Sequence, residues 1–166
     1  GMANVYVHVM QVPGCAECPG KFVNLKHLIL SVDVLARDSR TSGILRLACL
    51  LELSPILKHL ELHLLCPVGT WETLKRIEEL PPARELHYRL KTLLMTGVYG
   101  YNNFFVLALH YARTATALER MVIDPEARKR YVLTRDAVEE NAVHGGRRMA
   151  NEHLRGRGLD GILTIL

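Results

Sequence analysis

The feature that most constrains the fold is a leucine-containing motif that returns along the chain at nearly constant spacing. Leu60 follows Leu28 by 32 residues, Leu93 follows Leu60 by 33, and Met121 follows Leu93 by 28. Repeats of this length are typical of stacked architectures, because one unit cannot bury its apolar face without its neighbours. A chain of 166 residues is long enough for several such units to share one core.

Each copy of the motif also alternates between two sets of residues. In residues 22–32, Leu28, Leu30 and Val32 alternate with His27, Ile29 and Ser31, and the alternation returns in residues 58–64, 90–96 and 118–124. Successive residues of a strand face opposite sides of a sheet, so we expect the leucine set in the core. The pattern predicts an α/β leucine-rich-repeat solenoid, with a parallel sheet, helices on the convex side and irregular repeats of about 28–33 residues.

The segments between these strands favour helices. Residues 44–53 are apolar nearly all round and end at Ser54-Pro55, residues 104–115 have an apolar stripe, and residues 72–80 predict a short amphipathic helix. A further helix is expected at about 136–154, which Gly145-Gly146 either splits or begins, followed by a last strand within 159–166 that pairs with the fourth. The chain then divides into an N-terminal strand and turn segment (1–20, strand 5–10), the repeats (21–124) and a basic helical linker with a capping helix and strand (125–166).

We expect the outward-facing residues of the four repeat strands to bind a protein partner. Parallel neighbours lie about 4.8 Å apart, so His27 should lie beside His59 and form a small imidazole and carboxylate cluster with Glu61. Histidines that titrate near pH 6.5 would make binding there pH dependent. A register shift of one residue would exchange this set for the core set, so the assignment requires buried anchor leucines. The outward set is His27, Ile29, Ser31, His59, Glu61, His63, Thr92, Leu94, Thr96, Arg120, Val122 and Asp124.

No metal or cofactor is expected. Cys15 and Cys18 form a CxxC pair, but a structural zinc site needs four ligands and a matching second pair is missing. His59 and His63 are four strand residues, about 13 Å, apart and cannot share one ion. The two glycine spacings that bind phosphate, GxxxxGK[ST] and GxGxxG, are both absent. The HExxH, GxSxG and deaminase motifs of known enzymes are also absent, so catalysis is not expected.

The charge distribution suggests one alternative function. The net charge is +4, and residues 128–157 hold eight Arg and Lys against four acids, which leaves the rest of the chain neutral. This region either keeps an exposed helix soluble or binds nucleic acid or another polyanion; only Tyr131 supplies an aromatic for base stacking, so nucleic acid is the less favoured partner. No apolar run reaches the ~20 residues that span a bilayer, and no secretory signal is apparent at the N-terminus. We therefore expect a cytoplasmic or nuclear protein without a membrane partner.

Two segments with a Leu-Lys-His core, residues 22–28 and 56–62, resemble the leucine-rich repeats of plant F-box proteins. Residues 87–124 are similar to the FBD-associated element of that family, and residues 146–166 to its C-terminal tail. The resemblance implies the substrate-recognition half of a ubiquitin ligase subunit, with an unidentified protein substrate as partner. The F-box that docks the Skp adaptor of a cullin ligase has no counterpart in residues 1–20, so that recruitment would require an F-box that these residues do not contain.

Overall fold

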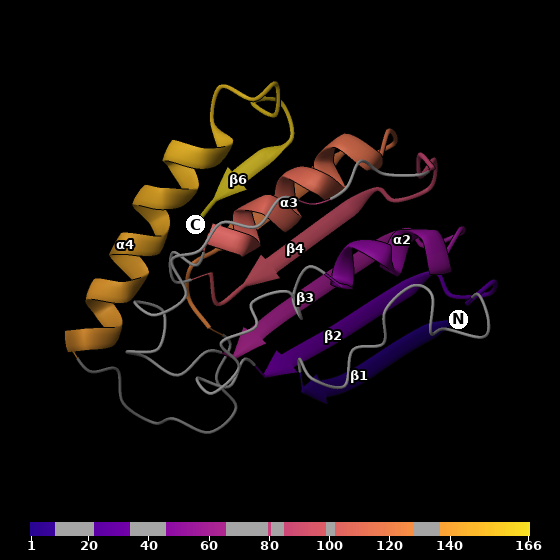
Figure 1. Cartoon of the computed structure of the whole chain (residues 1–166), viewed down its shortest axis with the longest axis horizontal. Helices are drawn as coiled ribbons and strands as arrows, with labels where there is room; N and C mark the ends of the chain where they lie inside the picture. Colours follow the sequence, from indigo (N-terminus) through magenta and orange to yellow (C-terminus); the bar gives the residue numbers. More distant parts are fainter. Residues whose placement is uncertain (9–21, 34–45, 66–79, 81–84, 99–101, 128–136) are drawn as a thin grey trace.

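The described part of the chain contains one six-stranded parallel sheet in the order β1-β2-β3-β4-β5-β6 (Figure 1). The computed structural model describes residues 1–8, 22–33, 46–65, 80, 85–98, 102–127 and 137–166. Each strand therefore lies beside the strand that follows it along the chain. The strands are β1 (Met2–His8), β2 (His27–Asp33), β3 (His59–Leu65), β4 (Thr92–Thr96), β5 (Arg120–Asp124) and β6 (Leu163–Ile165).

The register of the sheet stacks the anchor leucines on one another. Leu28 pairs with Leu60, Leu60 with Leu93, and Leu93 with Met121. These four side chains are exposed to 5% or less, and they belong to a single apolar core. Burial of a leucine-sized side chain stabilises a fold by roughly 1.5–3 kcal/mol, so a one-residue slip that exposed this column would be strongly unfavourable. The predicted register and the predicted burial are confirmed.

A single hydrogen-bond pattern recurs at the entrance to β3, β4 and β5. The backbone N–H groups of Lys58 and His59 both donate to the carbonyl oxygen of Lys26, at 2.8 and 3.1 Å. The same two bonds run from residues 91 and 92 to the carbonyl of Lys58, and from residues 119 and 120 to that of Lys91. Equivalent residues of successive copies of the motif therefore occupy equivalent positions along the edge of the sheet.

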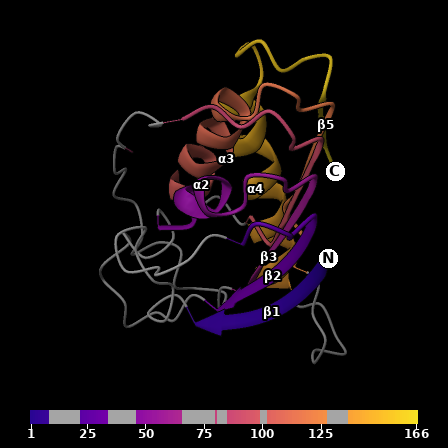
Figure 2. The ribbon, with the colours of Figure 1, turned by 90° about the vertical axis from the view of Figure 1, so that its right-hand side faces the viewer.

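The helices lie on one side of the sheet (Figure 2). They are the 3-10 helix η3 (Arg46–Cys49) and the α-helices α2 (Leu50–Leu53), α3 (Asn102–Thr114) and α4 (Ala137–Leu154). In α3 the side chains of Phe104, Phe105 and Tyr111 are buried, and the Tyr111 hydroxyl donates a hydrogen bond to the carbonyl of Leu47. This bond connects α3 to η3 across the helical layer.

Two helix predictions need correction. Residues 46–53 form a 3-10 turn followed by one α-helical turn instead of a single α-helix, and the N–H of Ser54 donates to Leu51 in the tight i−3 geometry that ends it. Helix α4 runs through Gly145-Gly146 without a break, so these glycines neither split it nor begin it. Buried side chains on both sides of the pair, such as Val143 and Ala150, offset the conformational entropy that glycine loses in a helix.

The two terminal strands meet the prediction in part. Strand β6 pairs with β5 as expected, whereas the N-terminal strand begins at Met2, earlier than the predicted residue 5. Several predictions fall outside the described residues: the CxxC pair Cys15 and Cys18, Tyr131, and the helix at 72–80 apart from residue 80. No helix in the described part of the chain combines the length and the apolar character needed to cross a bilayer.

Candidate partner-binding face of the sheet

The side of the sheet that faces away from the helices carries the predicted outward set of β2 to β5, and we call this set the open face. Figure 2 shows the described helices on the opposite side. Ten of its twelve side chains are partly or largely exposed. They are His27, Ile29, Ser31, His59, Glu61, His63, Thr92, Leu94, Arg120 and Asp124.

The remaining two members of the set are buried, which corrects the expectation that they are accessible. Thr96 has no exposed surface, and Val122 is 7% exposed. The Thr96 hydroxyl lies 2.9 Å from Nδ1 of His63, so the larger imidazole lies over it. Val122 is a short side chain between Leu94 of β4 and Thr164 of β6. Neither residue presents surface to a partner, although both have the predicted phase in the strand.

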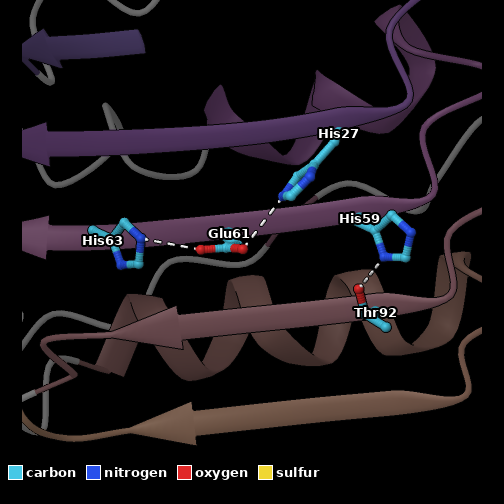
Figure 3. Close-up of polar contacts among 5 residues, drawn as sticks. All are labelled: His27, His59, Glu61, His63 and Thr92. Carbon is cyan, nitrogen blue, oxygen red and sulfur yellow. Dashed lines mark hydrogen bonds and ion pairs between the residues drawn. The ribbon is translucent and has the colours of Figure 1, made fainter. Parts of the chain in front are cut away.

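A carboxylate at the centre of the open face bridges two imidazoles (Figure 3). Glu61 Oε1 lies 3.3 Å from Nε2 of His27 on β2, and Glu61 Oε2 lies 3.4 Å from Nε2 of His63 on β3. Both distances exceed the 2.7–2.9 Å typical of a charge-assisted hydrogen bond, so both are loose polar contacts. The His27 side chain is 26% exposed and that of Glu61 is 27% exposed, which leaves both accessible to a docking group.

Each of the two histidines of β3 also contacts a threonine of β4. His59 Nδ1 lies 2.7 Å from the Thr92 hydroxyl, and His63 Nδ1 makes the equivalent contact with Thr96. These bonds hold the imidazoles in fixed orientations, which reduces the entropy that a partner must remove on binding. The His27 and His59 rings lie 5.5 Å apart between centroids, which confirms that these histidines are neighbours.

The arrangement does not form a metal site. Among the described residues, no group of three or more His, Cys, Asp or Glu side chains is placed to hold a metal ion. Figure 3 gives the physical reason within the open face: His59 turns toward Thr92, while Glu61 lies toward His27 and His63. A metal would have to displace these hydrogen bonds and rotate the His59 ring.

Three functional candidates were missed when the outward set was derived from strand periodicity. Lys26, Lys58 and Lys91 each stand one residue before a strand, and all three are exposed at the edge of the sheet where the strands begin. Only Lys91 has an ion pair among them in the described part of the chain, with Glu119 at 2.6 Å. The recurrence of a Leu-Lys pair before each of these strands could have indicated them. Strand alternation does not, because each lysine precedes the first residue of its strand.

The chain was compared with family models, curated proteins and solved structures, and none of the three comparisons gave a match. The function is therefore inferred from the chemistry and geometry of the open face.

Proposed function

We propose that this chain is a leucine-rich-repeat solenoid whose open face binds a protein partner. The observation that carries the proposal is the set of ten accessible side chains, which come from four strands in one register on the face opposite the helices. The set is mixed in character: Ile29 and Leu94 offer apolar contact, and the imidazoles and Glu61 offer hydrogen bonds. Mixed apolar and polar composition of this kind is typical of protein interfaces.

The solenoid assignment is supported by the repetition of local structure. The same pair of backbone hydrogen bonds precedes β3, β4 and β5, and the anchor side chains stack in one column. In stacked-repeat proteins the small rotation between neighbouring units creates an extended binding surface. Together with the resemblance of residues 22–28 and 56–62 to plant F-box repeats, this supports a role in recognising a protein substrate for ubiquitin ligation.

The basic C-terminal region is the alternative binding site. Arg147, Arg148, Arg155 and Arg157 are exposed on or just after α4. Three of them already have partners. Arg147 Nε donates to the carbonyl of Leu166 at 2.7 Å, Arg155 Nε donates to the side chain of Asn151, and Arg148 Nε lies 4.0 Å from the Glu152 carboxylate. This engagement leaves less of the region available to a polyanion, which favours the open face as the recognition surface.

Affinity capture from plant extract tests the proposal. The unchanged chain is compared with the open-face variant His59→Ala, Glu61→Ala, Arg120→Ala and with a control, His144→Ala, Arg148→Ala, Glu152→Ala. The control removes the same residue types from exposed positions of α4. We expect protein partners, identified by mass spectrometry, to be lost by the open-face variant and kept by the control. Retention of the same proteins by all three forms, or capture of nucleic acid alone, would refute the proposal.

A further inference from the structure

The edge of the open face at the start of the strands carries a row of basic side chains. Lys26, Lys58 and Lys91 occupy equivalent positions in three successive copies of the motif, and we call them the lysine row. The repeated backbone hydrogen bonds fix this alignment, because the carbonyls of Lys26 and Lys58 accept from the N–H groups of Lys58 and Lys91. Neighbouring strands are about 4.8 Å apart, so the row extends about 10 Å across β2, β3 and β4.

The lysine row is not neutralised by the described part of the chain. Lys91 pairs with Glu119, whereas Lys26 and Lys58 have no acidic partner among the described residues. The two lysines start from adjacent backbone positions, since the Lys58 N–H donates to the Lys26 carbonyl at 2.8 Å. An anionic group placed between Lys26 and Lys58 would gain two attractive contacts.

Charge is also unevenly distributed along the strand direction. The edge where the strands begin carries four positive side chains, the lysine row and Arg120, and one negative side chain, Glu119. With histidines neutral, its net charge is +3. The rest of the open face carries −2, from Glu61 and Asp124. A partner with acidic groups at only one edge of its contact would therefore bind in a single orientation. His27 and His59 lie directly beside the lysine row. His59 supplies a further donor from Nε2 when its Nδ1 accepts from the Thr92 hydroxyl, whereas the single N–H of a neutral His27 faces Glu61.

The dimensions of the open face suit an extended segment. From β2 to β5 it spans three strand spacings, about 14 Å, and five residues along each strand, about 16 Å. A segment of about five extended residues that crosses the strands would cover this width.

We propose that the partner of the open face is an extended protein segment rich in Asp or Glu, which lies across β2 to β4 with a carboxylate between Lys26 and Lys58. This inference rests on the proposed function and adds the chemistry of the ligand. The acidic side chains would also receive a hydrogen bond from His59, while Leu94 and Ile29 offer apolar contacts to the intervening residues.

The test is fluorescence anisotropy of the purified chain with three labelled probes. They are a 12-residue peptide of alternating Glu and Ser, a matched peptide of alternating Lys and Ser, and a 12-nucleotide oligothymidine. The protein variants are Lys26→Glu with Lys58→Glu, and a control, Arg148→Glu with Arg157→Glu, which has the same change in net charge at exposed positions. Circular dichroism verifies that both double variants fold.

We expect the Glu peptide to bind and the Lys peptide not to bind. Charge reversal at Lys26 and Lys58 should weaken binding of the Glu peptide at least ~10-fold at low salt, where charges act over tens of ångströms. The affinity of the control variant should stay within about 2-fold of the unchanged chain. No binding of the Glu peptide, or equal weakening by both double variants, would overturn the inference. Tighter binding of the oligothymidine with the same sensitivity to the lysine row would also overturn it, in favour of a nucleic acid ligand.

Failure of this inference is distinguishable from failure of the proposed function. If the lysine-row variant keeps a protein partner that the open-face variant loses, the open face still binds protein and only the acidic chemistry is wrong. If the partner is lost by neither, the proposed function fails as well.

Discussion

Replacement of His87 by alanine is expected to destabilise the chain by about 3 kcal/mol, because this imidazole connects Ser54 to the turn at residues 87–90. His87 is 5% exposed, and its Nε2 lies 2.9 Å from the carbonyl oxygen of Ser54. Its Nδ1 accepts from the backbone N–H of Leu90 at 3.0 Å and from that of Arg89 at 3.3 Å. A backbone N–H can only donate, so Nδ1 is the acceptor and Nε2 carries the proton.

The magnitude follows from what remains unpaired after the imidazole is removed. Leu90 is fully buried, and loss of the acceptor for its N–H costs about 2 kcal/mol. The Ser54 carbonyl keeps a second bond, from the N–H of Leu57 at 3.0 Å, so its loss costs about 1 kcal/mol. For a chain of this size the total corresponds to a decrease in Tm of roughly 6–12 °C.

Urea unfolding followed by far-UV circular dichroism measures the effect. His87→Asn places an amide oxygen near the position of Nδ1 and should keep the Leu90 bond, whereas His87→Gln places its amide nitrogen near Nε2 and should keep the Ser54 bond. We therefore expect His87→Gln, which loses the Leu90 bond, to lower the free energy of unfolding by about 2 kcal/mol. His87→Asn, which loses the Ser54 bond, should lower it by about 1 kcal/mol. Tyr88→Ala, at a neighbouring side chain that is 67% exposed, is the control and should cost less than about 0.5 kcal/mol. A His87→Ala variant as stable as this control would refute the reasoning.

Four further predictions concern stability. Gly97 has φ +78°, and a Cβ there would lie 2.1 Å from the carbonyl oxygen of Leu64, so Gly97→Ala should cost more than about 2 kcal/mol in urea unfolding. Gly145→Ala, in open space within α4, should instead stabilise by up to about 1 kcal/mol, and destabilisation there would contradict the helix assignment. A double-mutant cycle on Lys91 and Glu119, which are 47% and 64% exposed, should give a coupling below about 1 kcal/mol that falls with salt; a larger value would count against the exposed geometry. Burial lowers the pKa of His110 from its ordinary value of 6.5, and Arg113 adds to this, against opposing effects of Glu52 and the Ala48 backbone. The unfolded chain then takes up the proton first as the pH falls, so stability should decrease below pH 6.5, and His110→Gln should flatten that decrease in unfolding curves measured from pH 5 to 7.5.

The sequence predicted the sheet well because its signal is local and repeated. Alternation in residues 58–64 gives the phase of β3, and the return of the pattern every 28 to 33 residues gives the register between strands. The stacking of Leu28, Leu60, Leu93 and Met121 follows from that regularity, as does the adjacency of His27 and His59. The helices were predicted less well, because the continuity of α4 through Gly145-Gly146 depends on packing of its neighbours that no local propensity contains.

The candidate site was predicted in phase throughout, but two of its twelve positions are not accessible. Thr96 and Val122 alternate correctly with the core set, yet both are buried because larger neighbours on adjacent strands lie beside them. The direction in which His59 turns, toward Thr92 and away from Glu61, depends on a contact across 33 residues of sequence. The lysine row becomes a continuous surface only when three separate segments stack.

The sequence by itself determined which side chains share a face, because the two-residue period of an extended chain is a covalent property of each strand. The tertiary structure alone decided which of them remain accessible and how they are paired, as at Glu61 between His27 and His63. Accessibility and pairing depend on the sizes and positions of side chains brought together from distant segments, and these distances are fixed only when the sheet packs against its helices.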